Sequence, residues 1–168
     1  MRGFKVSLFL LAFVASVAQP QQNMDYENAY TAYESGKIDE SYIFLKRSLG
    51  SDPDHLPSKI LMGQVLALSS YYEDAKTEFE EALFANADPN LIVESYIRVL
   101  MMLKQYPEVL DLTERQLTPK RLGYVRSAKA IASSLLGETE NAAKYHELAY
   151  EASPQSPIVL NGAANFYL

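Results

Sequence analysis

The sequence predicts an all-α protein built from repeated pairs of antiparallel helices. The chain of 168 residues resembles itself at intervals of about 34 residues, with related segments beginning at Gly36, Ser70, Lys104 and Gly137. Within each interval, apolar residues recur every three or four positions, which is the spacing of one face of a helix. No useful length alternates with the period of two that is typical of a strand. Repeats of this length favour a stack of helix pairs.

The first eighteen residues predict a secretory signal peptide that is separate from the repeats. Arg2 and Lys5 form a basic start, Val6 to Val17 is uncharged and mostly apolar, and Ser16-Val17-Ala18 offers small residues for cleavage. This apolar stretch is shorter than the ~20 residues that a membrane span needs. We expect cleavage after Ala18, export to the periplasm of a Gram-negative bacterium or beyond it, and no stable transmembrane segment afterwards. An uncleaved anchor or a buried helix is the alternative.

The rest of the chain, residues 19–168, is expected to form one repeat domain. Its units cover about 22–55, 56–89, 90–122 and 123–156, with a partial unit over 157–168. In the second unit, a first helix over Ser58 to Leu68 ends at two serines. A second helix follows, and its apolar stripe consists of Tyr72, Ala75, Phe79, Ala82 and Leu83.

Small residues recur at three corresponding positions of most units. They are Ala29, Ser41, Ser48, Gly63, Ala75, Ala82, Ala130, Ala142 and Ala149. Small side chains at these points let two helices approach closely. With bulky residues such as Leu45 and Phe79 between them, and with prolines near the unit ends, the pattern resembles the tetratricopeptide repeat (TPR) family. That resemblance implies a right-handed α-solenoid of antiparallel helix pairs, with about four repeats and one unpaired C-terminal helix.

The third unit and the C-terminal segment depart from this pattern. Ile97, Val109 and Gln116 occupy the small positions, and Pro119 comes early, so we expect a shortened or wider second helix there. Ile158 to Leu168 reads as a first helix without a second and would leave an apolar face open. Two expectations follow: the chain is the front portion of a longer array, or this helix supports self-association or binding of another chain.

A narrower resemblance concerns several short motifs. They are Ala29, Tyr33 and Gly36 in an A-x-x-x-Y-x-x-G opening, the A-D-P-N link at Ala87 to Asn90, and the run from Tyr106 to Asp111. With the signal peptide, they resemble TPR proteins associated with exosortase/PEP-CTERM sorting and exopolysaccharide systems. Those proteins are usually longer lipoproteins, whereas this chain has no cysteine to carry a lipid.

Composition and motifs argue against catalysis, metals and cofactors. Hydrophobic residues make up 48% of the chain, and the net charge of −6 argues against a nucleic-acid surface. No phosphate-binding loop, dinucleotide fingerprint or nucleophile elbow occurs, and there is no cysteine. Of the two histidines, we expect His55 to lie in a solvated turn and His146 to be partly packed. Asp88 and Asn90 are expected to cap a helix rather than to bind calcium. We therefore expect no enzyme.

First helices line the concave groove of the solenoid that the resemblance implies. The residues expected there to bind a partner are Tyr26, Tyr30, Tyr33, Gln64, Glu94, Arg98, Met101, Met102 and Tyr124. Aromatic and methionine side chains give large, adaptable contact areas, which suit a protein or peptide ligand. Arg98 is the one cation expected in this groove.

The function predicted from these residues is that of an exported, non-catalytic scaffold for a protein or peptide partner in envelope assembly or secretion. Two alternatives stay open. The chain could serve an exopolysaccharide system, with Tyr26, Tyr30 and Tyr33 stacking on sugars, or it could be the N-terminal TPR portion of a longer protein.

Overall fold

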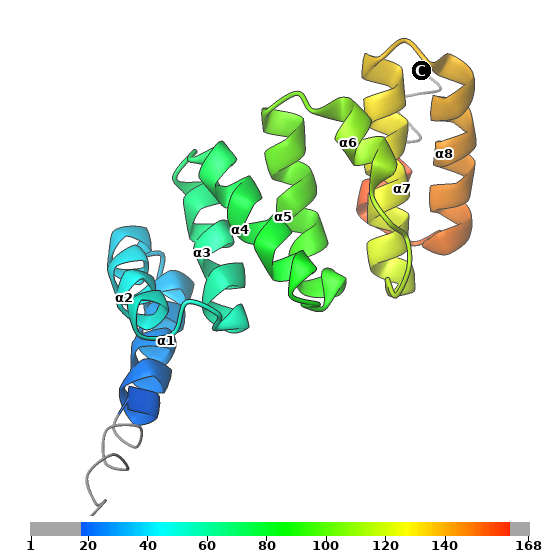
Figure 1. Ribbon diagram of the computed structural model, residues 1–168. Coiled ribbons are helices and arrows are strands. Elements are labelled where there is room, and N and C mark those ends of the chain that lie inside the picture. Colours follow the sequence, from blue (N-terminus) through cyan, green and yellow to red (C-terminus); the bar gives the residue numbers. More distant parts are fainter. Residues whose placement is uncertain (1–17, 162–168) are drawn as a thin grey trace, which may run out of the picture. The chain divides into compact units, whose positions relative to one another are not determined.

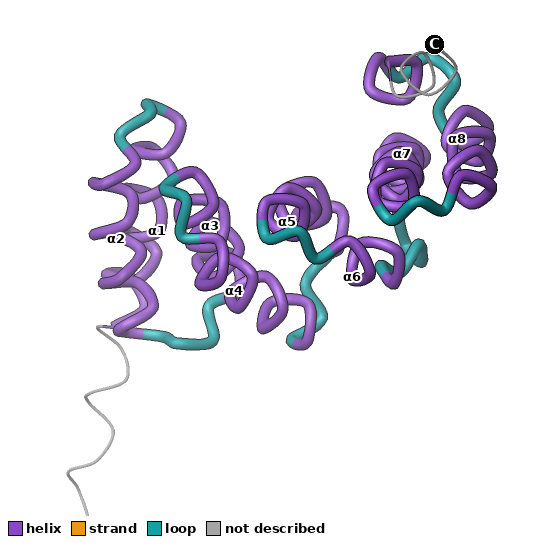
Figure 2. The backbone as a smooth tube through the Cα atoms, turned by 90° about the horizontal axis from the view of Figure 1, so that it is seen from above, coloured by secondary structure: helices purple, strands orange, loops and turns teal. Residues whose placement is uncertain are grey.

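The computed structural model describes residues 18–161, with side chains from Met24 onward, and these residues form helices joined by loops without a strand (Figures 1 and 2). The helices are α1 (Ala18–Glu34), α2 (Ile38–Ser51), α3 (Leu56–Leu68), α4 (Tyr72–Phe84), α5 (Pro89–Met102), α6 (Tyr106–Asp111), α7 (Pro119–Leu135) and α8 (Thr139–Ala152). A further helical stretch covers residues 157–161. The predicted all-α fold is confirmed. The expected signal peptide before Ala18, and residues 162–168 of the partial unit, lie outside the described residues.

The chain divides into two compact units, Met1–Ser58 and Lys59–Leu168. In the first unit, α1 packs against α2. The second unit contains most of α3 and all of α4 to α8, and α7 and α8 form its most extensive helix pair (Figure 1). Within the described residues, no helix is both long enough and apolar enough to span a bilayer.

The small residues of the repeat pattern are buried, as their expected places at helix crossings require. All nine are buried. The second unit shows why their size matters: a Cβ atom on Gly63 of α3 would lie 2.6 Å from Cε1 of Phe79 in α4. A Cβ atom on Gly123 of α7 would lie 2.7 Å from Cβ of Ser153. Real side chains do not tolerate such distances, so these helix pairs approach as closely as glycine allows.

Each first helix ends in the same turn. A residue with positive φ stands at Gly36, Ser70, Lys104 and Gly137, with φ between 58° and 80°. The N–H group that follows each of them donates to a carbonyl five residues back, as Gln105 does to Leu100 at 2.9 Å. This pattern satisfies carbonyl groups that the helix end would otherwise leave unpaired. The same turn conformation therefore recurs at the interval of about 34 residues that is seen in the sequence.

The third repeat has a shortened second helix, as its departures predict. α6 has only six residues, and Gln116 lies beyond it in an exposed loop with a φ of 62°. Gln116 therefore does not occupy a helix crossing, which the repeat register assigned to it. Pro119 is the first residue of α7, and the side chain of Thr118 caps that helix by accepting from the N–H of Arg121 at 3.5 Å. Proline is well suited to this first helical position.

Candidate functional site

The first helices α3, α5 and α7 of the second unit each end in a half-exposed apolar residue. Leu68, Met102 and Leu135 are the last residues of these helices and are 49%, 55% and 55% exposed. They are separated by 34 and 33 residues, so they hold corresponding positions in successive repeats. We call these three residues the apolar row. Exposed apolar surface that extends over successive repeats would be a candidate binding surface.

Polar contacts join the same three helices, nearer their starts than the apolar row is. The side-chain N–H of Gln64 in α3 donates to the carbonyl of Leu91 in α5 at 3.5 Å. Glu94 in α5 forms an ion pair with Arg121 in α7. Arg98 lies one helical turn before Met102 and is exposed. We call this surface the first-helix face. Its members are Gln64, Leu68, Leu91, Glu94, Arg98, Met101, Met102, Arg121, Tyr124, Ile131 and Leu135.

Tyr124 is the half-buried aromatic residue of the first-helix face. Burial raises the pKa of its hydroxyl, while the positive charges of Arg98 and Arg121 act in the opposite direction. These two cations are therefore near enough to the ring to influence its titration. Tyr124 thus lies among charged side chains of both α5 and α7, and a ligand on this face would meet aromatic, aliphatic and cationic groups together.

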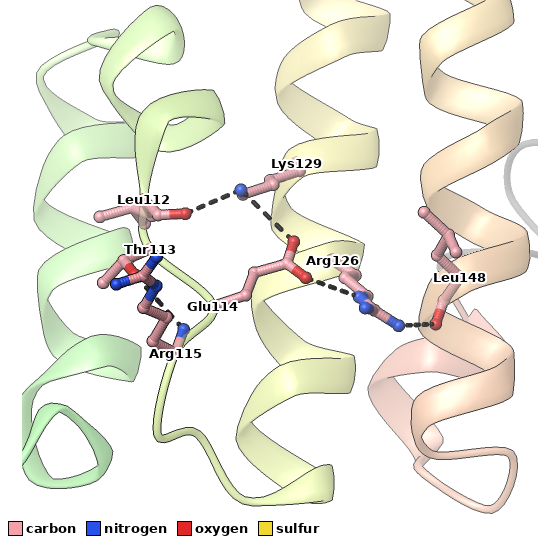
Figure 3. A network of polar contacts seen from close by, with 7 residues as sticks. All are labelled: Leu112, Thr113, Glu114, Arg115, Arg126, Lys129 and Leu148. Carbon is pink, nitrogen blue, oxygen red and sulfur yellow. Dashed lines mark hydrogen bonds and ion pairs between the residues drawn. The ribbon is translucent and has the colours of Figure 1, made fainter.

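Asn90 and Glu114 attach the loop after α6 to the helices around it. The side chain of Asn90 donates to the carbonyl of Gln116 at 2.8 Å and accepts from the N–H of Thr118 at 2.9 Å. Glu114 pairs with Arg126 at 3.0 Å and with the nearly buried Lys129 at 3.4 Å, both on α7 (Figure 3). These contacts fix the segment that replaces the missing part of α6.

The same two cations of α7 also bind backbone carbonyls. Lys129 donates to the carbonyl of Leu112 at 2.8 Å, and Arg126 donates to that of Leu148 in α8 at 3.0 Å (Figure 3). Arg126 and Lys129 therefore connect α7 to the α6 loop and to α8. Their roles are structural, and they position α7 for its contribution to the first-helix face.

The three tyrosines expected in the groove lie on α1 in the first unit. Tyr30 is 46% exposed, while Tyr26 and Tyr33 are half-buried. The ring of Tyr26 lies 6.5 Å from that of Tyr30 and contacts His55 edge-on, with centroids 5.4 Å apart. Burial, followed by the nearby Glu27 and Tyr30, raises the pKa of Tyr26. Tyr30 thus presents the most accessible of these three rings.

His55 is not the solvated turn residue that the sequence analysis expects. It is half-buried, and its Nδ1 atom lies 2.7 Å from Oγ of Ser58, which in turn lies 2.8 Å from Oγ of Ser48. Histidine beside serine is a pairing found in hydrolases. Here Ser58 is completely buried, so a substrate cannot reach its hydroxyl, and the chain of hydrogen bonds closes the start of α3 against α2. Among the described residues, no group of three or more acidic or histidine side chains could hold a metal ion.

Asp88 caps α5, as predicted. Its carboxylate accepts from the backbone N–H of Asn90 at 2.9 Å and from the Asn90 side chain at 2.8 Å. These hydrogen bonds lower the pKa of Asp88, and the bond from the backbone N–H of Asn90 has the larger effect. The acidic residues near this turn therefore have a structural role.

Six of the residues expected in the groove belong to α3, α5 and α7 of the second unit. They are Gln64, Glu94, Arg98, Met101, Met102 and Tyr124. Arg121 forms an ion pair with Glu94, so a second cation lies next to the residues expected in the groove, where the sequence predicts Arg98 as the one cation. The repeat register starts the fourth unit at residue 123, whereas α7 begins at Pro119, so Arg121 falls outside the predicted first helix. The Thr118-Pro119 pair was the available signal, since it is a typical helix start.

The chain resembles several solved structures of helical proteins, including the two that follow. One is a structure reported for the functional characterization of pilF from Pseudomonas aeruginosa, with a TM-score of 0.72 and 18% identity, covering 89% of this chain and 68% of that one. The other is a mutant of MamA, with a TM-score of 0.66 and 13% identity, covering 89% of this chain and 87% of that one. No protein-family model and no curated protein sequence matches the chain. At these identities the likeness concerns the fold, which is that of a TPR α-solenoid.

Proposed function

We propose that this chain is an exported, non-catalytic scaffold that binds a protein partner through the first-helix face of its second unit. The observation that carries the proposal is the apolar row. Leu68, Met102 and Leu135 are aliphatic or thioether side chains that remain about half exposed at corresponding positions. Burying them against a partner would release bound water and stabilise a complex.

The close packing of the helices that carry this face favours binding of a partner to it. The repeats that form the face contain buried small residues, and each first helix ends in a turn whose backbone groups are hydrogen-bonded. A preformed surface loses little conformational freedom when a ligand binds. The partner would therefore bear most of the ordering cost, as expected for a scaffold.

A protein ligand fits this surface better than a polysaccharide does. Sugar rings are usually recognised by stacking on exposed aromatic faces, whereas the apolar row contains no aromatic residue. The exposed ring of Tyr30 belongs to the first unit. We therefore place the binding of a protein first, and an envelope assembly or secretion pathway is the setting that the expected signal peptide supports.

The export part of the proposal rests on the sequence of the first eighteen residues. Its test is N-terminal sequencing of the protein recovered from the periplasm of a Gram-negative host. We expect the mature chain to begin at Gln19, directly after Ala18. Recovery of the uncleaved chain from the cytoplasm would contradict export without affecting the binding proposal.

Photo-crosslinking in cells that produce the protein tests the binding surface. A photoreactive amino acid replaces Met102 in the apolar row, and a matched variant carries it at Phe84, which is 92% exposed at the end of α4. We expect one discrete protein adduct from position 102 and none from position 84. Equal labelling at both positions, or an adduct with carbohydrate, would reject a protein-binding role for this face.

A further inference from the structure

Charge is divided unequally between the first and second helices of the second unit. α3, α5 and α7 carry six basic side chains and one acidic one. α4, α6 and α8 carry ten acidic side chains and two basic ones. The chain as a whole has a net charge of −6. An acidic protein thus concentrates its positive charge on the helices that form the first-helix face.

Some of this positive charge is available to a ligand. Four of the six basic residues of the first helices form ion pairs within the unit: Lys59, Arg121, Arg126 and Lys129. Arg98 and Lys120 are exposed and make no salt bridge with any described residue. Arg98 lies one turn before Met102 of the apolar row, and Lys120 lies in the first turn of α7. The face therefore pairs an apolar edge with a cationic one.

The helix dipoles reinforce this arrangement. The apolar row lies at the C-terminal ends of α3, α5 and α7, where the backbone carries partial negative charge. Lys120 lies near the N-terminal end of α7, where the backbone charge is partially positive. A ligand would accordingly place apolar groups over the helix ends and carboxylates toward the middle and start of the helices.

The expected spacing of the apolar row is consistent with a helical ligand. α3 contacts α5, and α5 contacts α7; packed helices typically lie about 8–10 Å apart, which is the separation we expect between neighbouring members of the apolar row. Seven residues of an α-helix rise about 10.5 Å, and a helix is about 10 Å wide. Such a helix spans both the apolar row and Arg98, which lies about 6 Å further along α5 at four residues' separation.

We propose that the first-helix face of the second unit binds an acidic amphipathic helix of a partner protein, with apolar side chains about seven residues apart on Leu68, Met102 and Leu135 and carboxylates facing Arg98. This inference rests on the proposed function and specifies the chemistry of the partner. Complementary charge supplies its argument: the face is cationic on a protein that is otherwise acidic, so a basic helix would be attracted to the second helices instead.

The test uses the full chain and two synthetic helical peptides of ~21 residues, the length of three repeats of a seven-residue pattern. Both peptides carry leucine at every seventh position, and they differ only in having glutamate or lysine on the flanking stripe. Fluorescence anisotropy measures their binding. We expect the glutamate peptide to bind at least about tenfold more tightly than the lysine peptide, and higher salt to reduce this difference.

Matched variants separate charge from apolar contact. Arg98→Glu should weaken binding of the glutamate peptide about tenfold, whereas Lys144→Glu, the same change on exposed α8, should leave it within about twofold. Met102→Ser should weaken binding, and Phe84→Ser should not.

Several outcomes would overturn the inference. They are equal affinity for both peptides, binding of neither, equal effects of Arg98→Glu and Lys144→Glu, or Arg98-dependent self-association of the chain in sedimentation. None of these removes a partner adduct at Met102 in cells, so they would reject the acidic helix while the proposed scaffold role still stood. Loss of that adduct would reject the scaffold role itself.

Discussion

Replacing Gly63 with alanine should destabilise the second unit, although alanine is the better helix former. The added Cβ atom would lie 2.6, 2.8 and 3.0 Å from Cε1, Cδ1 and Cζ of Phe79. Carbon atoms pack best at about 3.5–4.0 Å, so the ring would have to retreat by about 1 Å. Phe79 is completely buried and lies edge-on to Tyr96 with centroids 6.0 Å apart, so the ring would have to displace its neighbours to move.

The size of the effect follows from two opposing contributions. Overpacking a core costs about 1–3 kcal/mol, and the gain from replacing glycine by alanine inside a helix is about 1 kcal/mol. Because three ring atoms would lie within 3.0 Å of the added Cβ, the upper part of the overpacking range applies, and we expect a net loss of about 1–2 kcal/mol in the free energy of unfolding. Urea unfolding followed by far-ultraviolet circular dichroism measures it.

A double-mutant cycle identifies the cause. If the clash with Phe79 dominates, Phe79→Leu should cost less in the Gly63→Ala background than in the wild type, by about 0.5 kcal/mol or more. Additive effects would show that the Phe79 ring is not the obstacle. Unchanged or increased stability of Gly63→Ala alone would refute the close-approach argument for this helix pair.

Three further predictions concern the turns, the buried histidine and the α6 loop. An added Cβ meets nothing within 4 Å at Gly36 or at Gly50, but of these two only Gly36 has a positive φ. Gly36→Ala should therefore lower the free energy of unfolding by about 1 kcal/mol, whereas Gly50→Ala in α2 should raise it by about 0.5 kcal/mol. A lower free energy of unfolding in both variants would contradict the conformational argument. Burial lowers the pKa of His146, so below about pH 6.5 the unfolded chain binds a proton more readily than the native chain does, and stability decreases. The urea concentration at the unfolding midpoint should therefore decrease when the pH is lowered from 7.5 to 5.5, and it should decrease less in His146→Phe. Glu114→Gln removes the carboxylate shared by two cations of α7 and should lower the free energy of unfolding by about 2 kcal/mol. Glu147→Gln, at an exposed position of α8, should change it very little, and thermal unfolding of both variants measures the difference.

The repeat architecture was predictable from local sequence because each unit uses the same few positions. Close helix crossings demand small residues, as at Ala82 and Ala149, and those residues are visible in a single sequence. The shortened α6 could also be foreseen, since Pro119 interrupts the expected second helix. These features depend on contacts within one repeat, whose spacing the chain itself fixes.

Long-range polar contacts were not predictable in the same way. The ion pair between Glu94 and Arg121 joins two repeats, and its residues are separated by 27 positions. His55 was expected in solvent, but the edge of Tyr26 and the hydroxyl of Ser58 surround it in the folded first unit. Such partners depend on side-chain directions that periodicity does not specify. For the first-helix face, the sequence indicated residues of α3, α5 and α7 but not the ion pair that Arg121 forms with Glu94.

The short α6 has a consequence for how the second unit unfolds. In a repeat protein, each element is stabilised mainly by its neighbours, so cooperativity passes from one helix pair to the next. Between α5 and α7 that transmission depends partly on the polar attachments of Asn90 and Glu114, because half of a packing helix is absent. Amide hydrogen exchange should therefore separate α7 and α8 from α4 and α5 as two groups with different opening free energies. The third repeat is thus a boundary of cooperativity within the array.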